Sequence, residues 1–169
     1  MSSEVFVYVD GCCLGNGQRD ASARRAGLGI YAPHAELCVQ ESLDDDARLT
    51  NQRAELHAVI TALRLVAHDK LSVPRGTRVN IVSDNSTVVN AANAGPGSLP
   101  RGENVDLLQA LDRALAFAPL ARVTWTRAHT HEPVRTSASW AAWHGNAMAD
   151  ALSKAACGRV GKLRALLRR

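Results

Sequence analysis

The chain has 169 residues, 46% of them hydrophobic and 21% charged, which is enough for one domain that buries roughly 70% of its unfolded surface. No apolar run reaches the ~20 residues of a membrane span, and residues 1–4 lack the basic and apolar character of a signal segment. These features exclude membrane and secreted proteins and indicate an intracellular protein, cytoplasmic or nuclear. The formal net charge of +4 is a modest indication of a nucleic-acid partner.

The hydrophobic pattern predicts secondary structure in chain order. The β-branched and aromatic residues before Asp10 predict a strand over 4–10, and strands over 25–32 and 36–43 follow. Apolar residues at helical spacing predict an amphipathic helix over 51–68. The remaining elements are a strand over 79–83, helices over 86–93 and 105–117, a strand over 122–126, and a helix over 146–157 that starts at a Gly-Asn boundary.

The order of these elements predicts an α/β fold with a mixed sheet. The first three strands are joined by short connections, as antiparallel strands are, while the last two are separated by helices and should add in parallel. Trp125 lies on the last strand and is expected in the core, and Asp44 to Asp46 are expected to form a solvated turn. Cys12 and Cys13 are adjacent and no Cys-x-x-Cys pair occurs, so we expect the four cysteines to be reduced thiols.

Four acidic residues are predicted to face one cleft. Asp10 and Asp84 each follow a buried strand, Glu55 flanks the apolar stripe of its helix, and Asp150 lies in the early turns of the last helix. Carboxylate oxygens are the ligands that Mg²⁺ prefers, so this set predicts a magnesium site. Without metal, the four carboxylates should repel one another and titrate together, some with a raised pKa.

Each acid also has an ordinary structural interpretation. Asp10 could be a turn residue, Glu55 a solvated helix residue, Asp84 the N-cap of the next helix, and Asp150 a solvated residue of an early helical turn. The occurrence of all four in matching contexts favours the metal site.

Six short motifs surround these acids. They are Tyr8-Val9-Asp10-Gly11-Cys12-Cys13 followed by Asn16-Gly17, Ala26 to Tyr31, Thr50 to Leu56, Ser83 to Ser86, Asn104 to Leu108, and Trp125 to His129. In order and context they resemble type 1 ribonuclease H, with paired cysteines similar to those of the eukaryotic-type enzymes. The resemblance covers roughly Val5 to Ala156. It implies a ribonuclease H-like fold, in which a mixed five-stranded sheet carries helices on both faces.

The resemblance also implies an activity and roles for individual residues. The activity is hydrolysis of the RNA strand of RNA–DNA hybrids with two Mg²⁺ ions, which Mn²⁺ can replace, leaving 5′-phosphate and 3′-hydroxyl ends. The implied metal ligands are Asp10, Glu55, Asp84 and Asp150, and the implied mobile loop histidine is His129. The implied readers of the RNA strand are Asn16, Asn51 and Gln52, and the implied DNA-phosphate pocket is Arg48, Thr50 and Asn104.

Two segments depart from the family pattern. The spacing from His129 to Asp150 is about twice that of the family, so the intervening segment contains an apparent insertion, and His131 and His144 are alternatives to His129. Trp140 and Trp143 in this insertion are expected to pack the loop rather than stack on substrate. Residues 94–102 stand where many members carry a Trp- and Lys-rich basic handle, which this chain lacks.

The resulting prediction is a monomeric catalytic domain over 1–158 followed by a basic tail over 159–169 that supplies part of the missing substrate contact. A partner domain remains an alternative source of that contact. The chain could also be the ribonuclease H domain of a reverse transcriptase or retroelement polyprotein. A structure-selective DNA nuclease or resolvase, and a catalytically idle hybrid-binding module, are further alternatives. The amides beside Glu55 argue against the DNA nuclease, and the four acids argue against the idle module.

Overall fold

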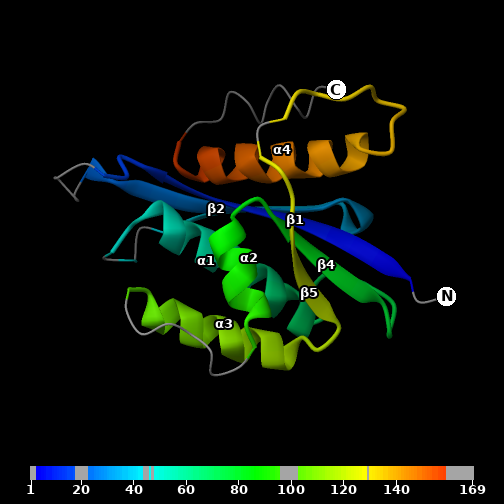
Figure 1. Ribbon diagram of the computed structural model, residues 1–169, viewed down its shortest axis with the longest axis horizontal. Helices are drawn as coiled ribbons and strands as arrows, with labels where there is room; N and C mark the ends of the chain where they lie inside the picture. Colours follow the sequence, from blue (N-terminus) through cyan, green and yellow to red (C-terminus); the bar gives the residue numbers. More distant parts are fainter. Residues whose placement is uncertain are drawn as a thin grey trace.

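The computed structural model describes residues 3–17, 23–43, 46, 48–95, 103–128 and 130–158. The strands are β1 (Glu4–Leu14), β2 (Arg25–Ala32), β3 (Leu37–Ser42), β4 (Arg78–Ser83) and β5 (Ala121–Trp125). The helices are α1 (Asn51–Ala67), α2 (Ser86–Asn93), α3 (Val105–Phe117) and α4 (Trp140–Ala156), with a short 3₁₀ turn, η2 (Pro33–Ala35), between β2 and β3. Figure 1 shows their arrangement.

The strands form one mixed sheet in the order β3-β2-β1-β4-β5. The first three strands pair antiparallel, and β4 and β5 add in parallel on the other side of β1. The sequence-based prediction of a mixed five-stranded sheet is therefore confirmed. Its physical basis is that short connections return the chain antiparallel, whereas helical crossovers return it parallel.

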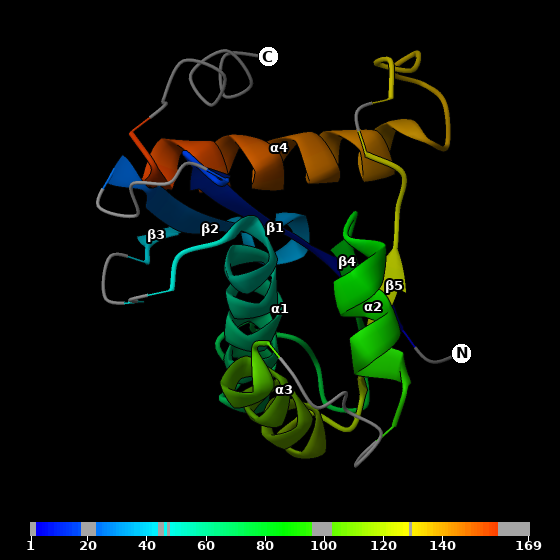
Figure 2. The same cartoon turned by 60° about the vertical axis from the view of Figure 1, so that its left-hand side comes forward.

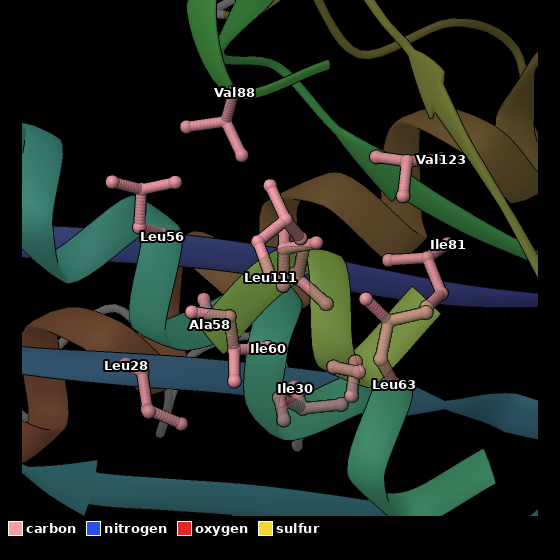
Figure 3. Close-up of a cluster of buried hydrophobic side chains, with 14 of the residues drawn as sticks. Leu28, Ile30, Leu56, Ala58, Ile60, Leu63, Ile81, Val88, Leu111 and Val123 are labelled. Carbon is pink, nitrogen blue, oxygen red and sulfur yellow. The ribbon is translucent and has the colours of Figure 1, made fainter. Parts of the chain in front are cut away.

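Helices cover both faces of the sheet, as predicted. Helix α4 lies along one face over β1 and β2, while α1 packs on the other face and α3 lies against α1 (Figure 2). The main core fills the space between α1 and the sheet, where Leu28 and Ile30 of β2 meet Ile60 and Leu63 of α1 (Figure 3). A smaller cluster on the α4 side contains Tyr8. Among the described residues no helix is long and apolar enough to cross a membrane.

Helix α4 begins at Trp140, so the start predicted at the Gly-Asn boundary is wrong. Gly145 lies inside the helix, where a Cβ would overlap the Tyr8 ring. The glycine therefore lets α4 lie close to β1 and does not mark the helix start. Residues of the apparent insertion form the first turn of α4. The Trp140 ring stabilises this turn by stacking on the His144 ring, with 4.6 Å between the ring centroids.

The aromatic residues of the insertion pack the loop, as expected. The Trp143 indole nitrogen donates to the Thr130 carbonyl over 3.1 Å, and the Arg135 guanidinium lies 5.4 Å from the centre of the Trp140 ring. Trp125 differs from the prediction, because 54% of its surface is exposed at the end of β5. Trp125 points to the same face of β5 as the buried Val123, but it is the last residue of the strand and lies beyond the part of that face that the core covers.

Candidate active site

The acids gather at the point along β1 where its pairing with β4 ends. Parallel pairing of β1 with β4 ends at Tyr8 opposite Val82, but β1 continues beside β2 as far as Leu14. Asp10 is therefore inside a long strand and does not end it, which corrects the predicted strand over 4–10. Because Asp84 follows directly after β4, it lies at the same edge as Asp10.

Gly11 brings the third acid to this edge. A Cβ on Gly11 would overlap the backbone of Ala54 and Glu55, so the absence of a side chain lets the first turn of α1 rest directly on β1. The Gly11 backbone N–H donates to Glu55 Oε2 over 3.2 Å. Glu55 is consequently buried against the strand, contrary to the solvated interpretation.

Three of the four predicted acids form a compact cluster. Asp10, Glu55 and Asp84 each offer a carboxylate oxygen, and these oxygens lie within 4.8 Å of one another. Asn85, rather than Asp84, caps α2 by accepting from the Val88 N–H, so the capping interpretation of Asp84 is wrong. Such a set of oxygen donors fits a hard divalent cation.

The electrostatics of the cluster follow from burial and crowding. Burial raises the pKa of Asp10 to about 7; the Ser153 hydroxyl opposes this rise, and the charges of Asp84 and Asp150 add to it. Burial, followed by the charges of Asp10 and Asp84, raises the pKa of Glu55 to about 9. A bound cation would favour the ionised forms of both groups and remove this penalty.

The fourth acid, Asp150, lies beside the cluster without joining it. Gly29, opposite Asp10 on β2, lets α4 approach the sheet because a Cβ there would overlap the backbone of α4. Ser153 then donates from its hydroxyl to Asp10. Asp150 instead forms an ion pair with Lys154, one turn further along the helix, at 2.5 Å. The expected four-acid set is thus three grouped acids and one paired acid.

Two residues for which the sequence predicted no role at the site hold Asp84 in place. The Asn146 side-chain amide donates to Asp84 Oδ2 over 3.3 Å, and the Trp125 indole N–H donates to the Asp84 carbonyl over 3.0 Å. No local pattern indicates either contact, because both residues come from distant elements. Lys154 could have been found, since it lies four residues after Asp150 in a predicted helix.

The three predicted readers of the RNA strand come together beside the acids. Asn16 Oδ1 accepts from the Asn51 backbone N–H over 3.2 Å, and Asn51 Oδ1 accepts from the Cys13 N–H over 3.3 Å. Gln52 Oε1 accepts from the Asn85 amide over 3.4 Å. These bonds use the side-chain oxygens, and the three NH₂ groups make no hydrogen bond to another described residue. Donors are therefore available at this surface.

The predicted phosphate pocket is organised around Arg53, which sequence reasoning left out. Arg53 Nη1 donates to Asn104 Oδ1 over 3.2 Å, and the Arg53 backbone N–H donates to the Thr50 hydroxyl over 3.2 Å. Arg48 pairs with Asp106 at 2.8 Å and remains largely exposed. Arg48, Thr50 and Asn104 are thus brought to one place.

Arg53 also overturns one expectation about the acidic turn. Asp46 is not solvated: its carboxylate is 11% exposed and lies 2.6 Å from Arg53 and 3.0 Å from the His57 ring. Burial alone would raise the pKa of Asp46, but the hydrogen bonds from Arg53, the Arg48 backbone and His57 hold it below its ordinary value. Asp46 is therefore a counterion of the buried Arg53 side chain.

Several predicted features lie outside the described residues. They are His129, Asp44, Asp45, residues 96–102 of the segment without the handle, and the tail over 159–169. Of the two alternatives to His129, His144 lies in the aromatic cluster, with its ring at 5.9 Å from Tyr31 and stacked on Trp140. His131 is exposed in the segment before α4.

The fold and its acid cluster define a class of α/β proteins with a carboxylate metal site at one edge of the sheet. The profile of the RNase H family matches residues 2–158. Ribonuclease H of Cupriavidus necator is 30% identical over 94% of this chain and 99% of its own length. The chain belongs to the RNase H family.

Further comparisons agree with this assignment. Ribonuclease H1 of Mus musculus is 47% identical over 64 residues, which are 37% of this chain and only 21% of the mouse protein. The solution structure of the PFV RNase H domain superposes with a TM-score of 0.65 at 21% identity, covering 94% of this chain and 96% of that domain. This structural likeness concerns the fold.

Proposed function

We propose that this chain is an endonuclease that hydrolyses the RNA strand of RNA–DNA hybrids with divalent metal. The proposal is carried by one observation: the cluster of Asp10, Glu55 and Asp84 lies next to amides that can contact 2′-hydroxyls. The family membership supports the same activity. Two Mg²⁺ ions, with Mn²⁺ as a substitute, are the proposed cofactors.

The roles of the acids follow from their positions. When bound, Mg²⁺ activates a water molecule and stabilises charge on the phosphate oxygens. Asp10 contacts both sides of the site: its carboxylate lies within 4.8 Å of those of Glu55 and Asp84, and it accepts from Ser153 on α4, the helix that carries Asp150. We therefore propose that Asp10, Glu55 and Asp84 would hold one cation, and that Asp10 and Asp150 would hold a second if Asp150 left Lys154.

The substrate is selected by groups beside the acids. An RNA strand in a near-A-form duplex displays 2′-hydroxyls across a wide minor groove, and amide NH₂ groups can donate to them. Asn16, Asn51 and Gln52 are such donors. Arg48, with Thr50 and Asn104, is assigned to a phosphate of the DNA strand, which positions the duplex without reading its sequence.

The remaining proposed roles concern segments that follow the last strand. We assign the loop histidine to His129, because His144 is engaged with Trp140 and Tyr31. We assign residues 1–158 to the catalytic domain. The basic tail over 159–169 is proposed to add phosphate contacts.

The test is a cleavage assay with four end-labelled duplexes of one sequence: RNA–DNA hybrid, double-stranded RNA, double-stranded DNA, and a hybrid whose RNA carries 2′-O-methyl groups. We expect cutting of the unmodified hybrid alone, with Mg²⁺ or Mn²⁺ and not with Ca²⁺, giving 5′-phosphate ends. The Asp10→Asn variant, purified identically, controls for contaminating nucleases. Equal cutting of double-stranded DNA would refute the substrate assignment and favour a structure-selective DNA nuclease.

A second variant tests the amide readers. Gln52→Ala removes a donor whose only hydrogen bond among the described residues is to Asn85. We expect weaker discrimination between the hybrid and its 2′-O-methyl form, with an unchanged metal requirement. Asn93→Ala is the matched control, because Asn93 donates to the Val89 and Val123 carbonyls at the other end of α2.

A further inference from the structure

Trp125 is an exposed aromatic residue at the same edge of the sheet as the acid cluster. It is the last residue of β5, an edge strand that lies beside α2 (Figure 2), and 54% of its surface is exposed. Burying this ring would be favourable, because a tryptophan carries a large apolar area. A large apolar side chain left exposed beside a candidate active site is typical of a contact with substrate.

The position of the ring is fixed by a hydrogen bond to the acid cluster. The Trp125 indole N–H donates to the Asp84 carbonyl over 3.0 Å. Backbone pairing holds the two segments together, because Ser83 lies opposite Trp125 and the Thr126 N–H donates to the Ser83 carbonyl over 3.0 Å. The indole N–H is the only side-chain donor of a tryptophan, so the ring has no donor left for a ligand. It offers a ligand an apolar face.

The ring extends a row of groups along the catalytic edge. Strands β1, β4 and β5 are parallel neighbours, and adjacent strands lie about 4.8 Å apart. The side chains of Asn16 and Asn51 lie beside the last residues of β1. Asp84 follows β4, and Trp125 ends β5. The acids therefore lie between these amides on one side and the indole ring on the other.

A hybrid bound to the amides and the acids continues toward β5. A strand of a duplex follows a smooth path, so an RNA strand with 2′-hydroxyls at the amides and a phosphate at the acids next passes Trp125. The bases are stacked inside the duplex and cannot stack on the ring. The sugars remain accessible in the wide minor groove, and their C–H groups are apolar partners for an indole face.

We propose that Trp125 binds the RNA strand of the hybrid, with its ring packed against a ribose on the far side of the scissile phosphate from the amides. This assignment rests on the proposed nuclease function. The contact is apolar and offers no donor to a base edge, so it adds affinity without reading the base sequence. It also places the substrate against the residue that holds the Asp84 backbone.

Hybrid affinity of ring variants tests this contact. Fluorescence anisotropy with a labelled RNA–DNA hybrid is measured in Ca²⁺, which separates binding from cleavage. We expect Trp125→Leu to weaken binding about five- to tenfold, near the lower end of aromatic stacking effects. Trp125→Phe should weaken it by less than about twofold, because phenylalanine keeps an aromatic ring. Both variants lose the indole N–H, so any effect through Asp84 is common to them and the difference between them reports the ring.

The matched control is Phe6→Leu, which removes another exposed aromatic ring from the sheet. Phe6 is 46% exposed and lies on β1 about 13 Å before Asp10 along the strand. Its replacement should leave hybrid affinity unchanged.

Three further measurements separate a ring contact from a change in the acid cluster. The slope of log affinity against log salt should be equal in Trp125→Leu and the unchanged protein, because the lost contact is not with a phosphate. Mn²⁺ binding without substrate, followed by electron paramagnetic resonance, should be equal in Trp125→Leu and Trp125→Phe. Hybrid binding should protect the fluorescence of the unchanged protein from acrylamide quenching, and Trp125→Phe should lose this protection.

The outcomes distinguish this contact from the nuclease function. If the unchanged protein binds and cleaves the hybrid while Trp125→Leu binds it equally well, the ring contact is refuted and the nuclease function stands. Equal losses of affinity in Trp125→Phe and Trp125→Leu, or equal acrylamide protection in Trp125→Phe and the unchanged protein, would also refute it. A shallower salt slope in Trp125→Leu would assign the loss to a phosphate contact instead. A failure of the unchanged protein to cleave the hybrid would refute the nuclease function, and this assignment with it.

Discussion

Each carboxylate of the acid cluster is oriented by neutral donors. Ser153 donates to Asp10, the Gly11 N–H donates to Glu55, and Asn146 donates to Asp84. These donors fix the oxygens but do not neutralise the charges. The cluster is thus prepared for a cation at a cost to the stability of the metal-free protein.

Asp10→Asn tests this exchange of stability for function. We expect hybrid cleavage to be abolished while hybrid affinity changes little, because most affinity comes from phosphate contacts. Without metal, we expect the free energy of unfolding to rise by about 0.5–2 kcal/mol, the usual gain when a functional site is relieved of strain. Thermal unfolding with a chelator measures this gain, and Asp112→Asn on α3 is the control. A lower melting temperature for Asp10→Asn would contradict the crowded-acid account.

At the scale of elements, Arg53 connects three segments. From the first turn of α1 it pairs with Asp46 before the helix, and with Asp106 and Asn104 at the start of α3. Hydrogen bonds from Arg53 hold the pKa of Asp106 well below its usual range. The Arg53 side chain is 5% exposed, so its partners compensate a largely buried charge.

The Arg53→Met variant tests whether the ion pairs of Arg53, and not only the packing of its side chain, stabilise the fold. Methionine keeps much of the side-chain volume but leaves Asp46 buried without its main counterion, and breaking a buried pair costs about 3–5 kcal/mol. Urea unfolding measures the loss. Arg64→Met, an exposed arginine on the same helix, should change stability by less than about 0.5 kcal/mol. Equal effects for the two variants would mean that Arg53 contributes no more than a surface charge.

For the whole molecule, the acid cluster sets how stability depends on pH. The pKa of Asp10 is raised to about 7 and that of Glu55 to about 9, both above the values near 4 of an unfolded chain. As pH rises above about 4, the unfolded chain loses these protons first, so the unfolding free energy falls until the folded groups ionise.

With respect to these two groups, we expect the metal-free protein to be most stable at or below about pH 4 and to lose stability as the pH rises to about 9. Saturating Mg²⁺ should restore the loss, because the ionised carboxylates then bind the cation. Urea unfolding at pH 5, 7 and 9, with chelator or with Mg²⁺, measures both effects. The Asp10→Asn, Glu55→Gln double variant should show a flatter profile. An unchanged slope in that variant would assign the pH dependence to other groups.

Much of the fold could be predicted from the sequence because it depends on local patterns. Local hydrophobic patterns, such as the helical spacing of apolar residues in α1, predicted the bounds of most elements to within a residue or two. The short connections between the first three strands and the helices between the later ones predicted the mixed sheet. The start of α4 could not be predicted in this way. Gly145 reads as a helix boundary locally, but its lack of a side chain serves contact with Tyr8, a residue far away in the chain.

The candidate site, like the fold, could be predicted only in part. The chain itself determined which acids are available and that Asp10 and Asp84 follow apolar strand residues. Only the tertiary structure decided that Asp10, Glu55 and Asp84 meet while Asp150 pairs with Lys154, that Trp125 is exposed, and that Asp46 is buried by Arg53. The physical reason is that strand and helix patterns arise from neighbouring residues, whereas a carboxylate's partners are set by which backbones can approach closely. At this site the close approach depends on Gly11 and Gly29.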